Sequence, residues 1–209
     1  SFTIYRDGRP MFIDVGGESY TKKTFSPQRY EIWTMQSQYH NLPTFGGAMQ
    51  EDGEEFGASQ VEYELGEKRS RIRMELAGAW KAGVVESYVR EVCLEKGRGV
   101  VIADQCRGNA GPAVLSLMTY EKPEILWAED EGRPGREKSA SAGSRDCQMV
   151  LGTLGSCRIR GAAQVRTEEI PVTDPRLKTA WDHNVFRTLV TFWGEGLQIL
   201  IPDDGEVRL

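Results

Sequence analysis

Apolar and polar residues alternate along most of this chain with the two-residue period of β-strands. The first two stretches, residues 2–5 and 10–14, flank Asp7-Gly8, a pair that favours the tight turn of a hairpin. Gly66-Glu67-Lys68 separates the members of a second predicted hairpin. The strands expected after the first hairpin cover residues 60–65, 69–76, 84–94, 99–106, 113–120, 148–152, 156–161, 163–167, 185–193 and 197–202.

Short strands at this spacing, with no alternation of strands and helices, predict an antiparallel sheet structure. Residues 185–193 and 197–202 are predicted to form the last hairpin, around Gly194-Glu195-Gly196. We therefore expect an all-β fold, an antiparallel two-layer β-sandwich, in a single domain that covers residues 1–209. Residues 129–143 are charged and rich in Gly and Ser, which indicates a loop within this domain.

One or two short helices are expected to accompany the strands. Ser26 followed by Pro27 is typical of a helix start and predicts a short helix over residues 28–35, with an irregular loop as the alternative. A second turn or short helix is expected from Asp174 to Trp181.

The composition limits the classes of partner. The net charge of −5 argues against a broad electrostatic grip on nucleic acid, although a local basic groove remains compatible with it. No apolar run approaches the roughly 20 residues of a membrane span, so no membrane partner is expected. The four cysteines, Cys93, Cys106, Cys147 and Cys157, have no zinc-knuckle spacing, and they fit either buried free thiols or two disulfides.

Two residues near the first hairpin stand out as candidate metal ligands. Asp14 ends the second predicted strand and His40 follows a polar stretch; a carboxylate and an imidazole are common zinc ligands. The structural alternatives are that Asp14 bonds the amides of Gly16-Gly17 and that His40 is a buried histidine bonded to the backbone. The other histidine, His183, is expected to lie in a turn.

No arrangement of a catalytic nucleophile is apparent. The chain has no Gly-x-Ser-x-Gly segment, and its paired glycines do not form a phosphate loop. Its five tryptophans could stack on sugar rings, but most are expected in the core. Trp33 and Trp127, which lie in or beside polar stretches, are the ones expected to be exposed.

The first 50 residues carry a specific sequence pattern. Its positions are Ser1-Phe2, Tyr5, Gly8, Pro10, Ile13-Asp14, Gly16, Ser19-Tyr20-Thr21, His40-Asn41, Gly46-Gly47 and Gln50. This pattern resembles the C-terminal β-sandwich region of the heparinase II/III-like polysaccharide lyases. Beyond residue 50 the resemblance extends only to general features, among them a strand that ends at Asp104 and Trp181 before Phe186-Arg187.

The resemblance implies a function that this chain would share with a preceding domain. In such lyases an α/α toroid precedes the sandwich, and the cleft between them cleaves acidic polysaccharides such as heparan sulfate or alginate by β-elimination. The toroid supplies most of the catalytic groups, so no catalytic residue is assigned here and the isolated chain is expected to be inactive. A free-standing carbohydrate-binding module and a structural or assembly sandwich are the alternatives.

The resemblance also implies a structural zinc site at Asp14 and His40. The third ligand would be a histidine from a His-x-His-type stretch that leads into Ser1-Phe2, and we therefore expect the chain to be a fragment of a longer protein. The expected partners are the acidic polysaccharide and the toroid of the same chain, with no nucleic acid. A periplasmic or extracellular location is favoured by the resemblance alone.

Overall fold

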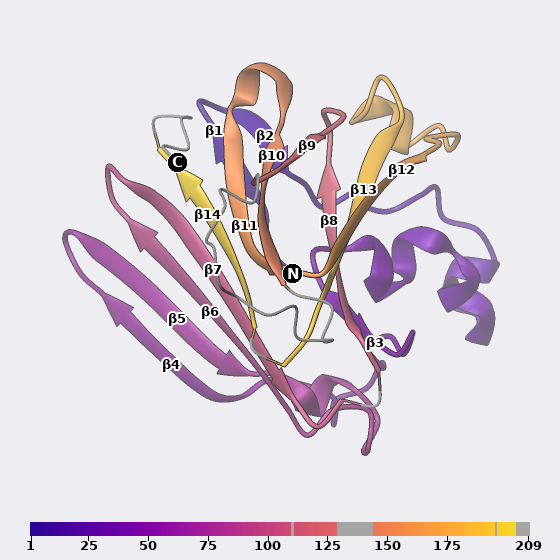
Figure 1. The fold of residues 1–209 in the computed structure, drawn as a ribbon. Helices are drawn as coiled ribbons and strands as arrows, with labels where there is room; N and C mark the ends of the chain where they lie inside the picture. The colour runs from indigo at the N-terminus through magenta and orange to yellow at the C-terminus, as the bar shows by residue number, and fades with distance from the viewer. Residues whose placement is uncertain (110, 129–143, 195, 204–209) are drawn as a thin grey trace.

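Two antiparallel sheets lie face to face in this computed structural model, which describes residues 1–109, 111–128, 144–194 and 196–203 (Figure 1). The all-β, two-layer sandwich predicted from the sequence is confirmed. The larger sheet has eight strands, in the order β4 (Ser59–Leu65), β5 (Arg69–Glu75), β6 (Ser87–Glu95), β7 (Gly99–Arg107), β14 (Leu197–Pro202), β11 (Ser156–Ala162), β10 (Arg145–Val150) and β9 (Glu124–Trp127).

The smaller sheet has four strands, in the order β12 (Gln164–Ile170), β13 (Val185–Phe192), β8 (Ala113–Thr119) and β3 (Pro43–Phe45). A separate hairpin of β1 (Ile4–Arg6) and β2 (Arg9–Phe12) connects the two layers. Arg6 donates hydrogen bonds to the carbonyls of Leu154 and Pro202, beside the larger sheet. The amide of Ile13 donates to the carbonyl of Met118 in β8, which ties the chain after β2 to the smaller sheet.

The smaller sheet is covered by apolar side chains on both faces. Leu115 and Leu117 of β8 belong to the main core between the sheets, where they join Ile102, Ile159 and other buried residues of the larger sheet. Met118 alternates to the other face of β8 and packs in a second cluster with Ile13. This second cluster supports the segment in which the candidate ligands lie.

The hairpin predictions hold for three pairs: β1 with β2, β4 with β5, and β6 with β7. Asp7 and Gly8 both have positive φ, as the predicted tight turn requires.

The predicted last hairpin, residues 185–193 with 197–202, is wrong. β13 pairs with β12 and β8 in the smaller sheet, whereas β14 pairs with β7 and β11 in the larger one. The chain therefore crosses from one layer to the other between Phe192 and Leu197. Leu197, Ile199 and Ile201 alternate along β14 and are buried on the inner face of the larger sheet. Burial of these side chains in the core therefore determines the partners of β14, even though β13 is its neighbour in sequence.

The helical segments of the described residues are short 3₁₀ turns. The predicted helix over residues 28–35 is replaced by η2 (Pro27–Glu31) and η3 (Trp33–Met35), because Ile32 between them has extended backbone angles. Ser26 caps η2 as predicted, its hydroxyl accepting from the amide of Gln28. The remaining turns are η1 (Lys23–Phe25), η4 (Ser37–Tyr39), η5 (Ala77–Ala79), η6 (Gly152–Leu154) and η7 (Leu177–Thr179), the last within the turn predicted after Asp174.

Turns η1 to η4 form the purple segment to the side of β8 and β3 in Figure 1. Two short strands, β3 and β9, were not expected from the sequence. The loop prediction for residues 129–143 lies outside the described residues. Among those described, no helix has the length and apolarity needed to cross a membrane.

Candidate functional site

The two sequence-predicted ligands, Asp14 and His40, lie side by side. Asp14 follows β2 by two residues, and His40 directly follows η4. Nδ1 of His40 lies 2.9 Å from Oδ2 of Asp14. The hydrogen bond from Ile13 to Met118 fixes the backbone beside Asp14, so the hairpin and the 3₁₀ segment are brought to the same edge of the smaller sheet.

Both ring nitrogens of His40 face acceptors. Nε2 lies 3.1 Å from the carbonyl oxygen of Thr34, which can only accept, and Nδ1 faces the carboxylate of Asp14. A proton on each nitrogen satisfies both partners, so this arrangement stabilises the imidazolium form. The hydrogen bond to Asp14 is the main cause that raises the pKa of His40.

The same hydrogen bond is the main cause that lowers the pKa of Asp14, and the amide of Gly16 contributes through a 3.0 Å bond to Oδ1. Each structural alternative is met in part, since Asp14 bonds the amide of Gly16 and His40 is half-buried rather than buried. Asp14 bonds a glycine amide and His40 bonds a backbone carbonyl, while their remaining atoms face each other.

The pair supplies two of the ligands that a tetrahedral metal site requires. Two ligand atoms about 2.0–2.1 Å from a tetrahedral zinc ion lie roughly 3.3 Å apart, so a separation of 2.9 Å needs only a small opening. The carbonyl of Thr34 is placed as the outer partner that commonly orients a metal-bound histidine. No cluster of three or more His, Cys, Asp or Glu side chains suited to a metal occurs among the described residues. The residues fit part of a zinc site.

Asn41 connects this pair to the core. Its side chain is fully buried and donates to the carbonyls of Phe2 (2.6 Å) and Ile13 (3.0 Å), and it accepts from the amide of Met118 (2.7 Å). One side chain thus joins the segment before β1, the end of β2 and strand β8. Hydrogen bonds to three segments of the chain therefore fix Asn41, the residue next to His40.

A buried ion pair lies directly beneath Asn41. Arg90 donates to both carboxylate oxygens of Asp104 at 2.7 and 2.6 Å, and its Nη1 donates to the carbonyl of Asn41 at 2.8 Å. Their side chains are 3% and 1% exposed. Sequence reasoning missed this pair as part of the site. Its signal was a charged residue at an inward position of each strand, Arg90 two residues after Tyr88 and Asp104 two residues after Ile102.

The 3₁₀ segment is also anchored to β13, an inner strand of the smaller sheet. The guanidinium of Arg187 lies 4.1 Å from the ring centre of Tyr39, pairs with Glu168 and donates to the carbonyl of Gln38 at 3.2 Å. These contacts fix the two residues before His40.

The exposed aromatic residues differ from those expected. Trp33 and Trp127 are only half-buried, and Trp193 is the exposed tryptophan, at 48%. Tyr20 and Phe25 instead form an exposed ring pair, with centres 5.7 Å apart, on the segment between Asp14 and His40. The guanidinium of Arg176 lies 4.8 Å from the ring centre of Tyr20, which adds a positive charge to this pair.

The four cysteines and the second histidine, His183, lie in the following environments. All four cysteines are free thiols, and Cys106, Cys147 and Cys157 are buried. His183 lies in the expected turn, stacked 4.1 Å from the ring centre of Tyr120.

Comparison with known proteins adds no relative to this picture. No family model matches the chain, and no curated protein matches it.

Proposed function

We propose that this chain is the C-terminal β-sandwich region of a heparinase II/III-like polysaccharide lyase, which cleaves uronate-containing polysaccharide by β-elimination. The observation that supports the proposal is the convergence of residues from the sequence pattern. The side chains of Asp14 and His40 face each other, and Asn41, next to His40, donates to the carbonyls of Phe2 and Ile13. Residues of the pattern that are up to 39 positions apart in the chain therefore meet at one place.

In this proposal the Asp14–His40 pair has a structural role. A zinc ion held by Oδ2 of Asp14, Nδ1 of His40 and a histidine that precedes Ser1 would fix the segment between the two ligands against the hairpin. When bound, the ion would supply a cross-link, with no part in the elimination itself. The groups that neutralise the uronate carboxylate and remove its C5 proton would come mainly from the preceding toroid.

The segment between the two ligands has the chemistry of a cleft wall for an acidic polymer. It carries Lys22, Lys23, whose ammonium pairs with Glu31 at 2.8 Å, and the exposed Tyr20–Phe25 pair, with Arg176 beside Tyr20. Aromatic faces pack on sugar rings and cations attract uronate carboxylates. A large exposed apolar patch near Phe2, Phe12 and Trp33 would favour the proposal by marking where the toroid packs, but Phe12 is fully buried and the other two are half-buried.

The test compares the chain with the longer protein from which we propose it derives. Heparan sulfate and alginate are incubated with each, and unsaturated uronate product is followed by its ultraviolet absorbance. We expect product from the longer protein and none from residues 1–209. Rapid turnover by residues 1–209 alone would contradict the division of roles.

Metal analysis of the longer protein tests the zinc assignment separately. Asp14→Asn and His40→Gln should each lower the bound zinc to well below one ion per chain. The matched controls are Asp182→Asn and His183→Gln, since this second Asp–His pair is exposed and its atoms lie 4.0 Å apart. Equal zinc content in all four variants would exclude Asp14 and His40 as ligands.

The alternative of a carbohydrate-binding module receives less support from the aromatic residues. A row of coplanar exposed tryptophans would favour it, but four of the five are at least half-buried.

A further inference from the structure

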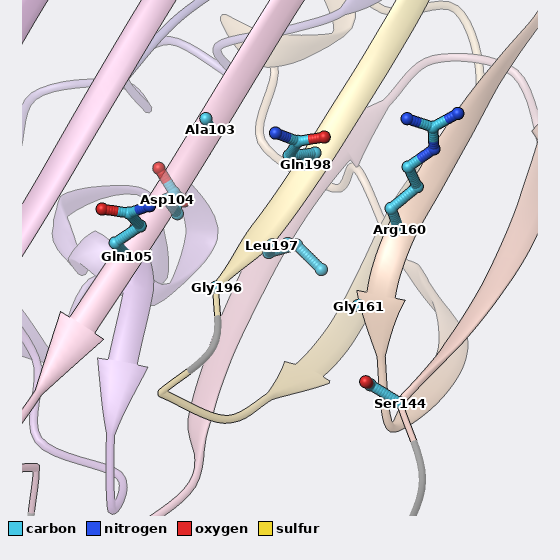
Figure 2. Close-up of a pocket in the computed structure, with 9 residues that line it drawn as sticks. All are labelled: Ala103, Asp104, Gln105, Ser144, Arg160, Gly161, Gly196, Leu197 and Gln198. Atoms are coloured by element: carbon cyan, nitrogen blue, oxygen red, sulfur yellow. The ribbon is translucent and has the colours of Figure 1, made fainter.

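A shallow depression lies on the outer face of the larger sheet, where strands β7, β14 and β11 run side by side (Figure 2). Its volume is about 220 Å³, below the roughly 300–1,000 Å³ of pockets that enclose drug-sized ligands. Ala103, Gln198 and Arg160 are register partners across the three strands, and Gln105 lies two residues further along β7. The size and shape suit a ligand of one sugar ring.

Two glycines form the floor of this depression. A Cβ atom on Gly161 would collide with the carbonyl oxygen of Gly196, and one on Gly196 would lie 2.7 Å from the carbonyl oxygen of Asp104. Both have positive φ. Strands β11, β14 and β7 can therefore approach closely here only because neither position has a side chain.

The polar side chains around the floor have a common chemistry. Figure 2 shows Gln198 and Arg160 on neighbouring strands, with Gln105 further along β7 and Ser144 at the edge. Glutamine amides can both donate to and accept from hydroxyl groups, whereas a guanidinium donates in a planar fork that matches a carboxylate. Within the described part of the chain, no aromatic side chain lines the depression. Hydroxyl groups next to a carboxylate are the features of a uronate.

Arg160 is available to an anionic ligand. Among the residues that the structure describes, it pairs with Asp146 at 3.6 Å, and both side chains are nearly half exposed, at 45% and 46%. An exposed ion pair of this kind contributes roughly 0–1 kcal/mol, so a ligand carboxylate can replace Asp146 at little cost.

This depression is separate from the Asp14–His40 site. Asp104 directs its carboxylate to Arg90 on the inner face of β7, while the neighbouring Gln105 is exposed on the outer face. We infer that the depression is a second, non-catalytic binding site for one uronate unit of an acidic saccharide. Arg160 binds the carboxylate, and Gln105 and Gln198 bind the ring hydroxyls. The inference goes beyond the proposed lyase function and holds without it.

Titration of residues 1–209 with an alginate tetrasaccharide, followed by NMR of side-chain N–H groups, tests this site. We expect saturable shifts of the Gln105 and Gln198 amides and of Arg160 Nε. Gln198→Ala should weaken binding by about five- to tenfold and Arg160→Gln by more than about tenfold, in keeping with the loss of a neutral and of a charged hydrogen bond. A neutral glucose tetrasaccharide should bind far more weakly.

Arg166→Gln is the matched control, because Arg166 is exposed on β12 of the smaller sheet and the substitution removes the same charge. We expect it to leave the affinity within about twofold of the unchanged chain. Equal weakening by Arg160→Gln and Arg166→Gln would show attraction by overall charge and overturn the inference. So would equal binding of the neutral tetrasaccharide, or no shift at the three side chains. Lyase activity is not part of this readout, so failure of either proposal leaves the other standing.

Discussion

Nδ1 of His40 and Oδ2 of Asp14 lie 2.9 Å apart, although the two residues are 26 positions apart in the chain. The hydrogen bond between them is the main cause of both pKa shifts, upward for His40 and downward for Asp14. The contact therefore links the stability of the metal-free chain to pH, and the direction of this link can be worked out for each group.

For His40 the pKa is higher in the folded chain than the ordinary value of 6.5. Its contribution to stability is therefore fully present below pH 6.5 and is lost as the pH rises through the raised folded pKa. For Asp14 the folded pKa is below 3.8, so its contribution is present above that value and is lost as the pH falls through the lowered pKa. The pair stabilises the fold most between these two ordinary values.

His40→Gln should consequently lower the free energy of unfolding by about 1 kcal/mol near pH 5.5, and by less near pH 9. Urea unfolding at the two pH values measures the difference. His183→Gln, in an exposed turn, serves as the control and should change little at either pH. A deficit for His40→Gln that is equal at both pH values would show that packing, rather than the ion pair, is lost.

Asn41→Leu should be strongly destabilising although the two side chains have a similar branched shape. The substitution leaves the carbonyls of Phe2 and Ile13 and the amide of Met118 without their partner, and each unpaired buried group costs about 1–3 kcal/mol. We expect a total loss of about 3–5 kcal/mol in denaturant unfolding. Asn184→Leu, which removes side-chain bonds at a half-buried position, should cost about 1 kcal/mol. Comparable losses in the two variants would argue against Asn41 as the link among three segments.

Because Arg90 and Asp104 form a buried ion pair, a single and a double substitution should have different effects on the stability of the fold. Asp104→Asn leaves a buried guanidinium without its counter-charge and should cost about 3–5 kcal/mol. Replacing both residues, Arg90→Met with Asp104→Leu, removes both buried charges and should recover most of that loss. The carbonyl of Asn41 still loses its donor in the double variant, so recovery should be incomplete. Thermal unfolding of the three chains checks the order, and a double variant no more stable than the single one would contradict it.

The sequence predicted the strands and the antiparallel sheet structure better than the connections between strands. Asp7-Gly8 predicts its hairpin because two consecutive positive φ angles are a local requirement. The link between β13 and β14 has the length of a hairpin loop, but it crosses between layers, because both strands find partners elsewhere. Pairing of this kind depends on the whole core, and no local pattern encodes it. Strand β3 is three residues long and has too few positions to show alternation.

The residues of the candidate site also differ in how well they could be predicted from the sequence. Asp14 and His40 were recognisable by their chemistry and by the sequence pattern, and they do meet. Arg90 and Asp104 stand at inward positions, two residues after Tyr88 and Ile102, but nothing in the sequence identifies them as partners. Only the register of β6 against β7 shows that the two charges lie opposite each other in the core.

The cysteines allow the two alternatives drawn from the sequence to be separated by chemistry. Burial raises the pKa of Cys157 to about 12 and that of Cys106 and Cys147 to about 11. Near pH 8 a thiol with a pKa of 11 is roughly 0.1% thiolate, the form that reacts with iodoacetamide. We therefore expect only the half-buried Cys93 to be alkylated readily in the folded chain, and all four cysteines in urea without reductant, as read by mass spectrometry. Two thiols that stay unreactive in urea until a reductant is added would instead reveal a disulfide and overturn the free-thiol assignment.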